Sequence, residues 1–118
     1  MKSFRELIVW QKAMKHVKTI YLISNNFPSS ERYGLTDQIR RSSVSVPSNI
    51  AEGYGRGSTN DYIRFLNIAR GSLYELETQA EVAFLLNYIS DKDCTEVINQ
   101  SVEIEKMLNT LIKKLASK

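Results

Sequence analysis

Residues capable of nucleophilic or acid–base chemistry are few, and their spacing fits no familiar reaction centre. The chain has one histidine, His16, and one cysteine, Cys94. A di-iron helical bundle needs a glutamate three residues before a histidine, and Ala13 occupies that position. A Cys–His nucleophile pair would have to meet, whereas we expect His16 on a solvated helix flank and Cys94 in the core. We therefore predict no metal, no cofactor and no enzyme activity.

Two further patterns resemble parts of a reaction centre and are better explained by structure. Glu77 and Glu81 share one helical face beside Glu75, but without a nucleophile or cofactor motif we interpret them as solvent-facing or paired with arginine. The glycines between Gly53 and Gly57 resemble a phosphate-binding loop. No strand precedes them and no Gly-Lys-Ser/Thr follows, so the mechanism of such a loop is missing. They indicate the end of a helix.

Basic residues offer a different chemistry, the neutralisation of phosphate groups. The formal net charge is +3 and the pI is about 9.0, which is compatible with an acidic partner without requiring one. An ordinary solvated surface explains most of these charges, although identical subunits would repeat a small patch. Our candidates for nucleic-acid contact are Arg40, Arg56, Arg64, Lys113 and Lys114. Of these, Arg40 or Arg64 could equally pair with a carboxylate of another subunit.

Helices must position these residues, because apolar side chains recur at three- and four-residue intervals in four stretches. The first begins at a capping box formed by Ser3 and Glu6, and the third and fourth begin after Ser58 and Ser90. Short connections between long helices make neighbours antiparallel. We predict an all-α fold with a single domain over residues 1–118, an antiparallel up-down-up-down four-helix bundle.

The second helix is unusual because Pro47 lies in its middle. Proline removes one backbone hydrogen bond and clashes with the preceding turn, so we expect one helix kinked there; the alternative is a new helix starting near Pro47. A polar stripe beside a face of small residues predicts a partly buried cluster, since covered charges need partners. In this cluster Arg41, Asn49 and Glu52 would bond one another or Glu75 or Glu77.

Several features predict a cytoplasmic protein that assembles with itself. A lone cysteine forms no internal disulfide, and no signal peptide or membrane-spanning apolar run is visible. The first helix is apolar on more than one side, because Val9, Trp10 and Ile20 extend beyond the stripe that one core needs. Gly71 interrupts the third helix and predicts a close crossing with a partner helix. We expect a homo-oligomer and no membrane contact.

Three motifs carry a resemblance that covers essentially the whole chain. They are LIVWQKA at residues 7–13, QIRRSSVSVPSNIAEG at residues 38–53 and FLNIARGSLYELET at residues 65–78. With these motifs the chain resembles the bacterial 23S rRNA intervening-sequence proteins. The proline-centred motif is the specific one, whereas the fourth helix is only generically similar.

The resemblance implies a ring-shaped homopentamer and an association with ribosomal RNA or other nucleic acid, and it assigns no catalytic residue. Combined with the basic residues, it favours a non-enzymatic nucleic-acid-binding accessory protein. The alternative is a scaffold ring that binds another protein and touches no nucleic acid. A continuous basic face on the assembly would favour the first interpretation, and a face of mixed charge the second.

Overall fold

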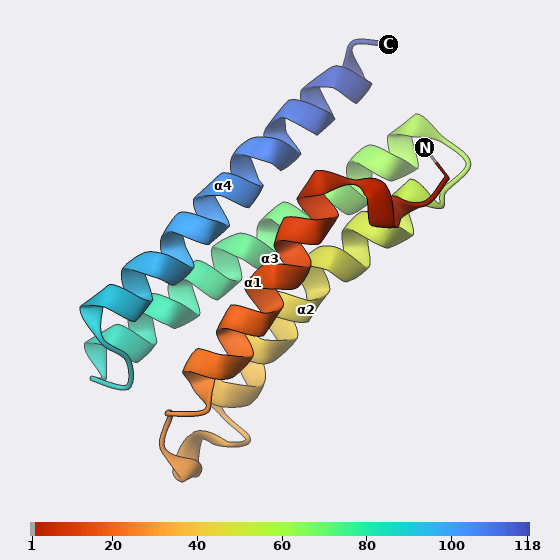
Figure 1. Cartoon of the computed structure of the whole chain (residues 1–118). Coiled ribbons are helices and arrows are strands. Elements are labelled where there is room, and N and C mark those ends of the chain that lie inside the picture. The colour runs from red at the N-terminus through yellow and green to blue at the C-terminus, as the bar shows by residue number, and fades with distance from the viewer. Residues whose placement is uncertain (1) are drawn as a thin grey trace.

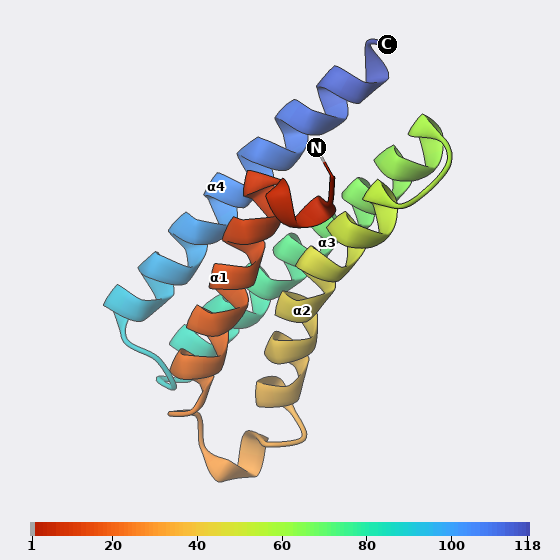
Figure 2. The same cartoon turned by 45° about the vertical axis from the view of Figure 1, so that its right-hand side comes forward.

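The chain forms four long helices, and each of the last three runs back along the one before it (Figure 1). The computed structural model describes residues 2–118, in which α1 spans Ile8–Ser24, α2 Leu35–Tyr54, α3 Thr59–Leu85 and α4 Asp91–Ala116. Each helix packs on two neighbours, so that α1 lies between α2 and α4 (Figure 2). Residues 2–118 contain no β-strand. The predicted all-α four-helix fold is therefore confirmed.

Serine caps start the last two helices where the sequence placed them. The Ser58 hydroxyl accepts the amide of Asp61 at 3.1 Å, and the Ser90 hydroxyl accepts the amide of Asp93 at 3.1 Å. Each cap satisfies an amide that has no partner within the helix. Asp91 and Asp93 lie in the first turn of α4, where carboxylates favour the positive end of the helix dipole.

The start of the first helix differs from the prediction. Ser3 caps a single 3₁₀ turn, η1 at Phe4–Glu6, and Leu7 is extended at φ −70° and ψ 123° before α1 begins. The Glu6 carboxylate accepts the Lys2 amide at 2.8 Å instead of returning to Ser3. The Phe4 ring packs edge-on against Trp10 with 5.3 Å between centroids. This aromatic contact holds η1 against α1 and replaces the first turn that the capping box predicted.

Helix α2 continues unbroken through the buried Pro47, as the single-helix prediction required; the kink there remains a prediction. Its packing against α3 is the most extensive in the bundle, and small residues make that possible. A side-chain carbon at Gly53 would lie 2.8 Å from Cβ of Phe65 and 3.2 Å from the carbonyl oxygen of Tyr62. Only glycine fits at this crossing.

The core fills the whole length of the bundle in two clusters. One consists of Val9, Ala13, Val46, Ile50, Leu66, Ala69, Leu73, Ile104 and Leu108. The other consists of Ile20, Phe27, Ile39, Leu76, Ala80, Ala83 and Val97. Val9 and Ile20 were expected to extend outside the core, and both are buried in it. No helix among residues 2–118 is long and apolar enough to span a bilayer.

His16 was predicted at the surface and is instead buried in the core, with only 1% of its surface exposed. Its Nε2 lies 3.2 Å from the carbonyl oxygen of Val97 on α4. Because a carbonyl only accepts, the neutral ring carries its proton on Nε2 and donates it there. Burial lowers the pKa of His16 to about 4. The histidine therefore packs as a neutral group that ties α1 to α4.

The close crossing predicted at Gly71 does not occur within the chain, and a crossing there with another copy stays a prediction. Nothing lies within 4 Å of the position that its side chain would occupy, so no helix of the same chain crosses closely there. The close crossing within the chain is at Gly53.

Candidate nucleic-acid interface

Four of the five candidate cations gather at one end of the bundle. Arg56 lies in the loop between α2 and α3, Arg64 lies near the start of α3, and Lys113 and Lys114 lie in the last turn of α4. This loop and the end of α4 lie at the same end of the molecule (Figure 1). Together with Lys118, these residues are called the basic end.

The two arginines of the basic end share one aromatic platform. The Arg56 and Arg64 guanidinium carbons lie 4.7 and 4.6 Å from the centroid of the Phe65 ring. Arg56 also pairs with Glu52 at 3.9 Å, and Arg64 with Asp61 at 3.5 Å. Such exposed ion pairs contribute little stability. A phosphate group can therefore replace either carboxylate while the ring still orients the guanidinium.

Lys113 and Lys114 of the basic end are exposed at the negative end of the α4 dipole. Within residues 2–118 neither Lys113 nor Lys114 forms an ion pair. A polyanion can bind them without first displacing a carboxylate of the same chain.

Arg40 does not belong to this surface. It lies on α2 near the opposite end of the bundle, where its Nε donates to Ser24 Oγ at 2.8 Å and its Nη2 to Asn25 Oδ1 at 3.0 Å. Its guanidinium also lies 4.6 Å from the centroid of the Tyr21 ring. These contacts hold the end of α1 against α2. Within the chain, Arg40 therefore has a structural role.

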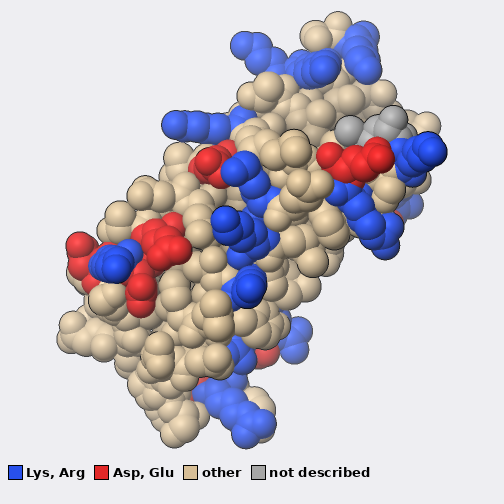
Figure 3. All heavy atoms as spheres, in the orientation of Figure 1, with Lys and Arg blue, Asp and Glu red and all other residues tan. Residues whose placement is uncertain are grey.

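Charge is distributed unevenly along the bundle (Figure 3). Lysine and arginine gather around the end of α4, whereas carboxylates gather over its start, at Asp91 and Asp93. Lysine and arginine, among them Lys92 and Arg40, also lie at the far end, so the two ends differ in the share of each charge. We call the end that holds Asp91 and Asp93 the acidic end.

The predicted polar cluster does not form as expected. Arg41 donates to Asp37 at 3.0 Å, Asn49 donates to the Ser45 carbonyl at 2.8 Å, and Glu52 pairs with Arg56. Each of these contacts joins residues four apart on one helix or its immediate continuation, where neighbouring side chains meet most easily. Arg41 and Glu52 are exposed, so they do not need a partner across the bundle.

Serine hydroxyls join α2 to α3 instead. The Ser42 hydroxyl lies 3.1 Å from Glu75 Oε1 and 2.9 Å from Gln79 Oε1. Further along the crossing, the hydroxyls of Ser45 and Ser72 lie 2.8 Å apart. Glu75 is thus the one member of the predicted cluster that bonds across to α2. In the sequence, the run of small polar residues on α2 was the feature that could have predicted these serine contacts with α3.

Glu77, the last member of the cluster, faces α4 and meets Glu105. Burial is the main cause that raises the pKa of Glu77 to about 8, and the Glu105 carboxyl adds a hydrogen bond and like charge, with a smaller effect from Glu81. At neutral pH the Glu77–Glu105 pair therefore holds a proton between two carboxyls.

This pair makes stability fall as the pH rises. The folded chain keeps a proton that the unfolded chain releases above its ordinary pKa of 4.5, so stability is lost from there up to about pH 8. We expect Glu77→Gln to raise the free energy of unfolding at pH 9 by about 1–2 kcal/mol. A pKa difference of one is worth about 1.4 kcal/mol. The expected gain is smaller than the whole pKa shift would give, because water screens this half-buried group.

Urea unfolding at pH 5 and pH 9 measures this effect. Glu96→Gln, an exposed carboxyl on α4, is the control and should change little. An equal response of both variants at the two pH values would contradict a shared proton.

Cys94 packs as the predicted core residue. Its sulfur lies 3.8 Å from the carbonyl oxygen of Ala80, and burial is the main cause that raises the pKa of the thiol. Within the described part of the chain, no three histidine, cysteine or carboxylate side chains converge as metal ligands.

Comparison with known proteins places the chain in a family. A family model described as 23S rRNA-intervening sequence protein matches residues 5–110. A crystal structure of a protein of unknown function from the S23 ribosomal protein family of Bacteroides thetaiotaomicron is similar, with 30% sequence identity and a TM-score of 0.81. The similarity covers 90% of this chain and 99% of that one. No curated protein matches. The chain thus belongs to the 23S rRNA-intervening sequence protein family.

Proposed function

We propose that this protein is a cytoplasmic, non-enzymatic, homopentameric accessory protein that binds ribosomal or other structured RNA through its basic end. The observation that carries the proposal is the gathering of Arg56, Arg64, Lys113 and Lys114 at one end of the bundle, away from Asp91 and Asp93 at the start of α4. The family description, with its reference to 23S rRNA, supports RNA as the polyanion. Contacts of this kind recognise phosphates and give little base specificity.

Binding should therefore depend strongly on salt. Phosphate neutralisation releases counterions, so an assembly making six or more contacts should lose about 10³-fold in affinity between 50 and 200 mM salt. Lys113→Ala combined with Lys114→Ala should lower the salt slope by about two for each subunit that contacts the RNA, because each loses two phosphate contacts. Lys92→Ala, an exposed lysine at the acidic end, is the matched control.

Fluorescence anisotropy with a labelled ribosomal RNA hairpin provides the measurement. The parent and the control should bind alike, and the double variant should bind all hairpin sequences more weakly. Absence of binding at tens of micromolar protein, with the oligomer intact, would overturn RNA binding.

A second copy of the chain is the proposed occupant of the apolar face between α1 and α2. A groove of about 350 Å³ there is lined by Trp10, Met14, Val17, Val44, Pro47, Ser48 and Ala51. Met14 and Val44 are 44% and 40% exposed, a large fraction for apolar side chains on adjacent helices. Val9 and Ile20 are buried in the core, so we assign the contact between copies to this groove.

Light scattering coupled to size exclusion should give the mass of a pentamer at micromolar concentration. Val44→Asp should lower that mass, because a carboxylate would have to be buried without a partner. Ser30→Asp, in the exposed connection between α1 and α2, is the control and should leave the mass unchanged. A monomer mass for the parent protein would refute assembly.

The second candidate function is a protein-binding scaffold ring without nucleic-acid contact. A specific observation favours it, an apolar groove between the start of α1 and the last turns of α4. Failure of the RNA titration with an intact ring would favour this function.

A further inference from the structure

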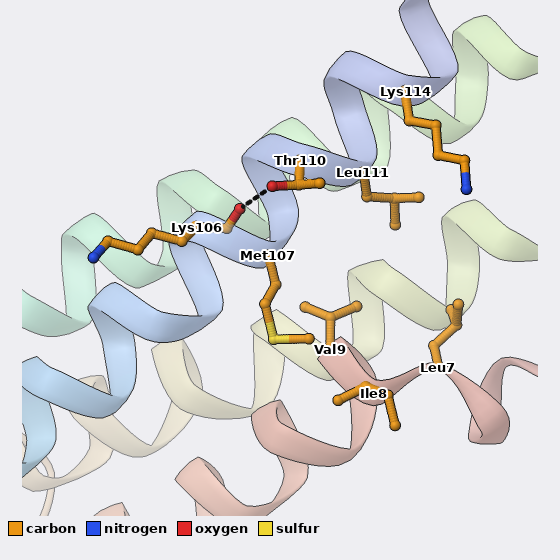
Figure 4. Close-up of a pocket in the computed structure, with 8 residues that line it drawn as sticks. All are labelled: Leu7, Ile8, Val9, Lys106, Met107, Thr110, Leu111 and Lys114. Atoms are coloured by element: carbon orange, nitrogen blue, oxygen red, sulfur yellow. Dashed lines mark hydrogen bonds between the residues drawn. The ribbon is translucent and has the colours of Figure 1, made fainter.

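An apolar groove of about 410 Å³ separates the start of α1 from the last turns of α4 (Figure 4). Leu7, Ile8 and Val9 form one wall, and Met107 and Leu111 project towards them from α4. Lys106, Thr110 and Lys114 complete the lining. No carboxylate is among these lining residues.

The groove follows from the way the chain enters α1. Because Leu7 is extended and η1 folds onto Trp10, no preceding helical turn of α1 covers this stretch of α4. Ile8 is left 54% exposed at its edge. Leu7, Met107 and Leu111 are partly buried because they also pack against the core.

Two lysines make the groove positively charged. Lys106 and Lys114 lie at either end of the lining of α4, eight residues apart and so about 12 Å along the helix axis (Figure 4). Within residues 2–118 neither forms an ion pair. The Thr110 hydroxyl donates to the Lys106 carbonyl oxygen at 3.0 Å, so its proton is not free to bond a ligand. A complementary ligand needs an apolar centre and negative charges about two helical turns apart.

We propose that this groove docks a short, acidic amphipathic helix of a partner protein. Apolar side chains at positions i, i+3, i+4 and i+7 of that helix fill the groove over two turns. Carboxylates on its flanks pair with Lys106 and Lys114. The partner helix supplies the charge that the groove lacks and covers the apolar wall at Ile8.

RNA fits the groove less well than a helix does. The lining offers aliphatic side chains and no aromatic ring on which a base could stack. Phosphates would contact the lysines, and the apolar lining between them would stay exposed to water. The inference therefore does not rest on RNA binding, although Lys114 borders both surfaces.

Three labelled 16-residue helical peptides test the proposal by fluorescence anisotropy with the full chain. The first carries leucine at i, i+3, i+4 and i+7 with glutamate flanks, the second has lysine flanks, and the third has serine in place of leucine. We expect the glutamate peptide to bind with a Kd on the order of 10 µM, and the other two at least about tenfold more weakly. Equal binding of the glutamate and lysine peptides, or of the glutamate and serine peptides, would overturn the proposal.

Variants locate the site. Leu111→Ser should weaken the glutamate peptide at least about tenfold, and Lys106→Glu combined with Lys114→Glu should reverse the preference between the two charged peptides. Lys92→Glu at the acidic end should change neither, and circular dichroism checks that each variant folds. A lower oligomer mass for Leu111→Ser would instead show that another copy of the chain covers the groove, and would refute a foreign helix. Peptide binding is independent of the RNA titration, so either proposal can fail alone.

Discussion

Gly53→Val should lower the free energy of unfolding by about 3 kcal/mol, the upper end of the usual cost of overpacking. Even a single added carbon would lie 2.8 Å from Cβ of Phe65 and 3.2 Å from the carbonyl oxygen of Tyr62. The backbone of α3 cannot rotate away as a flexible side chain can. The two helices would have to separate along the crossing that also holds the Ser45–Ser72 hydrogen bond.

Gly71→Val is the matched control, the same substitution in the interior of the adjacent helix. Its side chain would enter open space, and valine is slightly better than glycine inside a helix, so stability should stay within about 0.5 kcal/mol of the parent. Urea unfolding of both variants under the same conditions measures the two changes in the free energy of unfolding. Similar losses at the two positions would contradict the crossing at Gly53. A lower oligomer mass for Gly71→Val alone would reveal the partner helix that the sequence predicted there.

Acidification from pH 6.5 towards pH 4 should remove about 3 kcal/mol of stability through His16 alone. The unfolded chain binds a proton at the ordinary pKa of 6.5, whereas burial holds the folded pKa at about 4. The unfolded state therefore carries more protons throughout this window, and stability falls as the pH falls. The Glu77–Glu105 pair acts in the opposite direction, so the contribution of His16 must be isolated by a variant.

His16→Leu provides that variant, because leucine has no proton to bind. The difference in unfolding free energy between parent and variant should change by about 3 kcal/mol between pH 7 and pH 4, whatever its value at pH 7. His16 is the only histidine, so its imidazole proton resonance can be followed directly by NMR and should stay in the neutral position at pH 5.5. A resonance that titrates near pH 6.5 would show that the ring is accessible to water.

The sequence predicted features that depend on neighbours along the chain. Apolar spacing gave the four helices, and a serine followed by an acidic residue three positions later gave the caps at Ser58 and Ser90. These signals are local, and the forces behind them act within one or two turns. The helix stop near Gly55 and the continuity of α2 through Pro47 could be predicted for the same reason.

Contacts between helices were harder to predict. The buried face of α1 is wide because it packs on both α2 and α4, and periodicity alone could not decide whether His16 lies at its edge or within it. Glu77 and Glu105 are far apart in sequence, so nothing local indicates that they meet. The candidate site was predicted in part. The gathering of Arg56, Arg64, Lys113 and Lys114 needs the antiparallel topology, and the anchoring of Arg40 needs the geometry of the α1–α2 turn.

The uneven charge along the bundle gives the chain a more positive end and a less positive end, separated along its long dimension of 46 Å, and so an electric dipole. A polyanion exerts a torque on such a dipole and turns the basic end towards itself before any contact forms. The rate of association should then respond to salt more strongly than the rate of dissociation, because screening shortens the range of the torque. Orientation before contact would allow modest local charges to speed encounter without tightening the final complex.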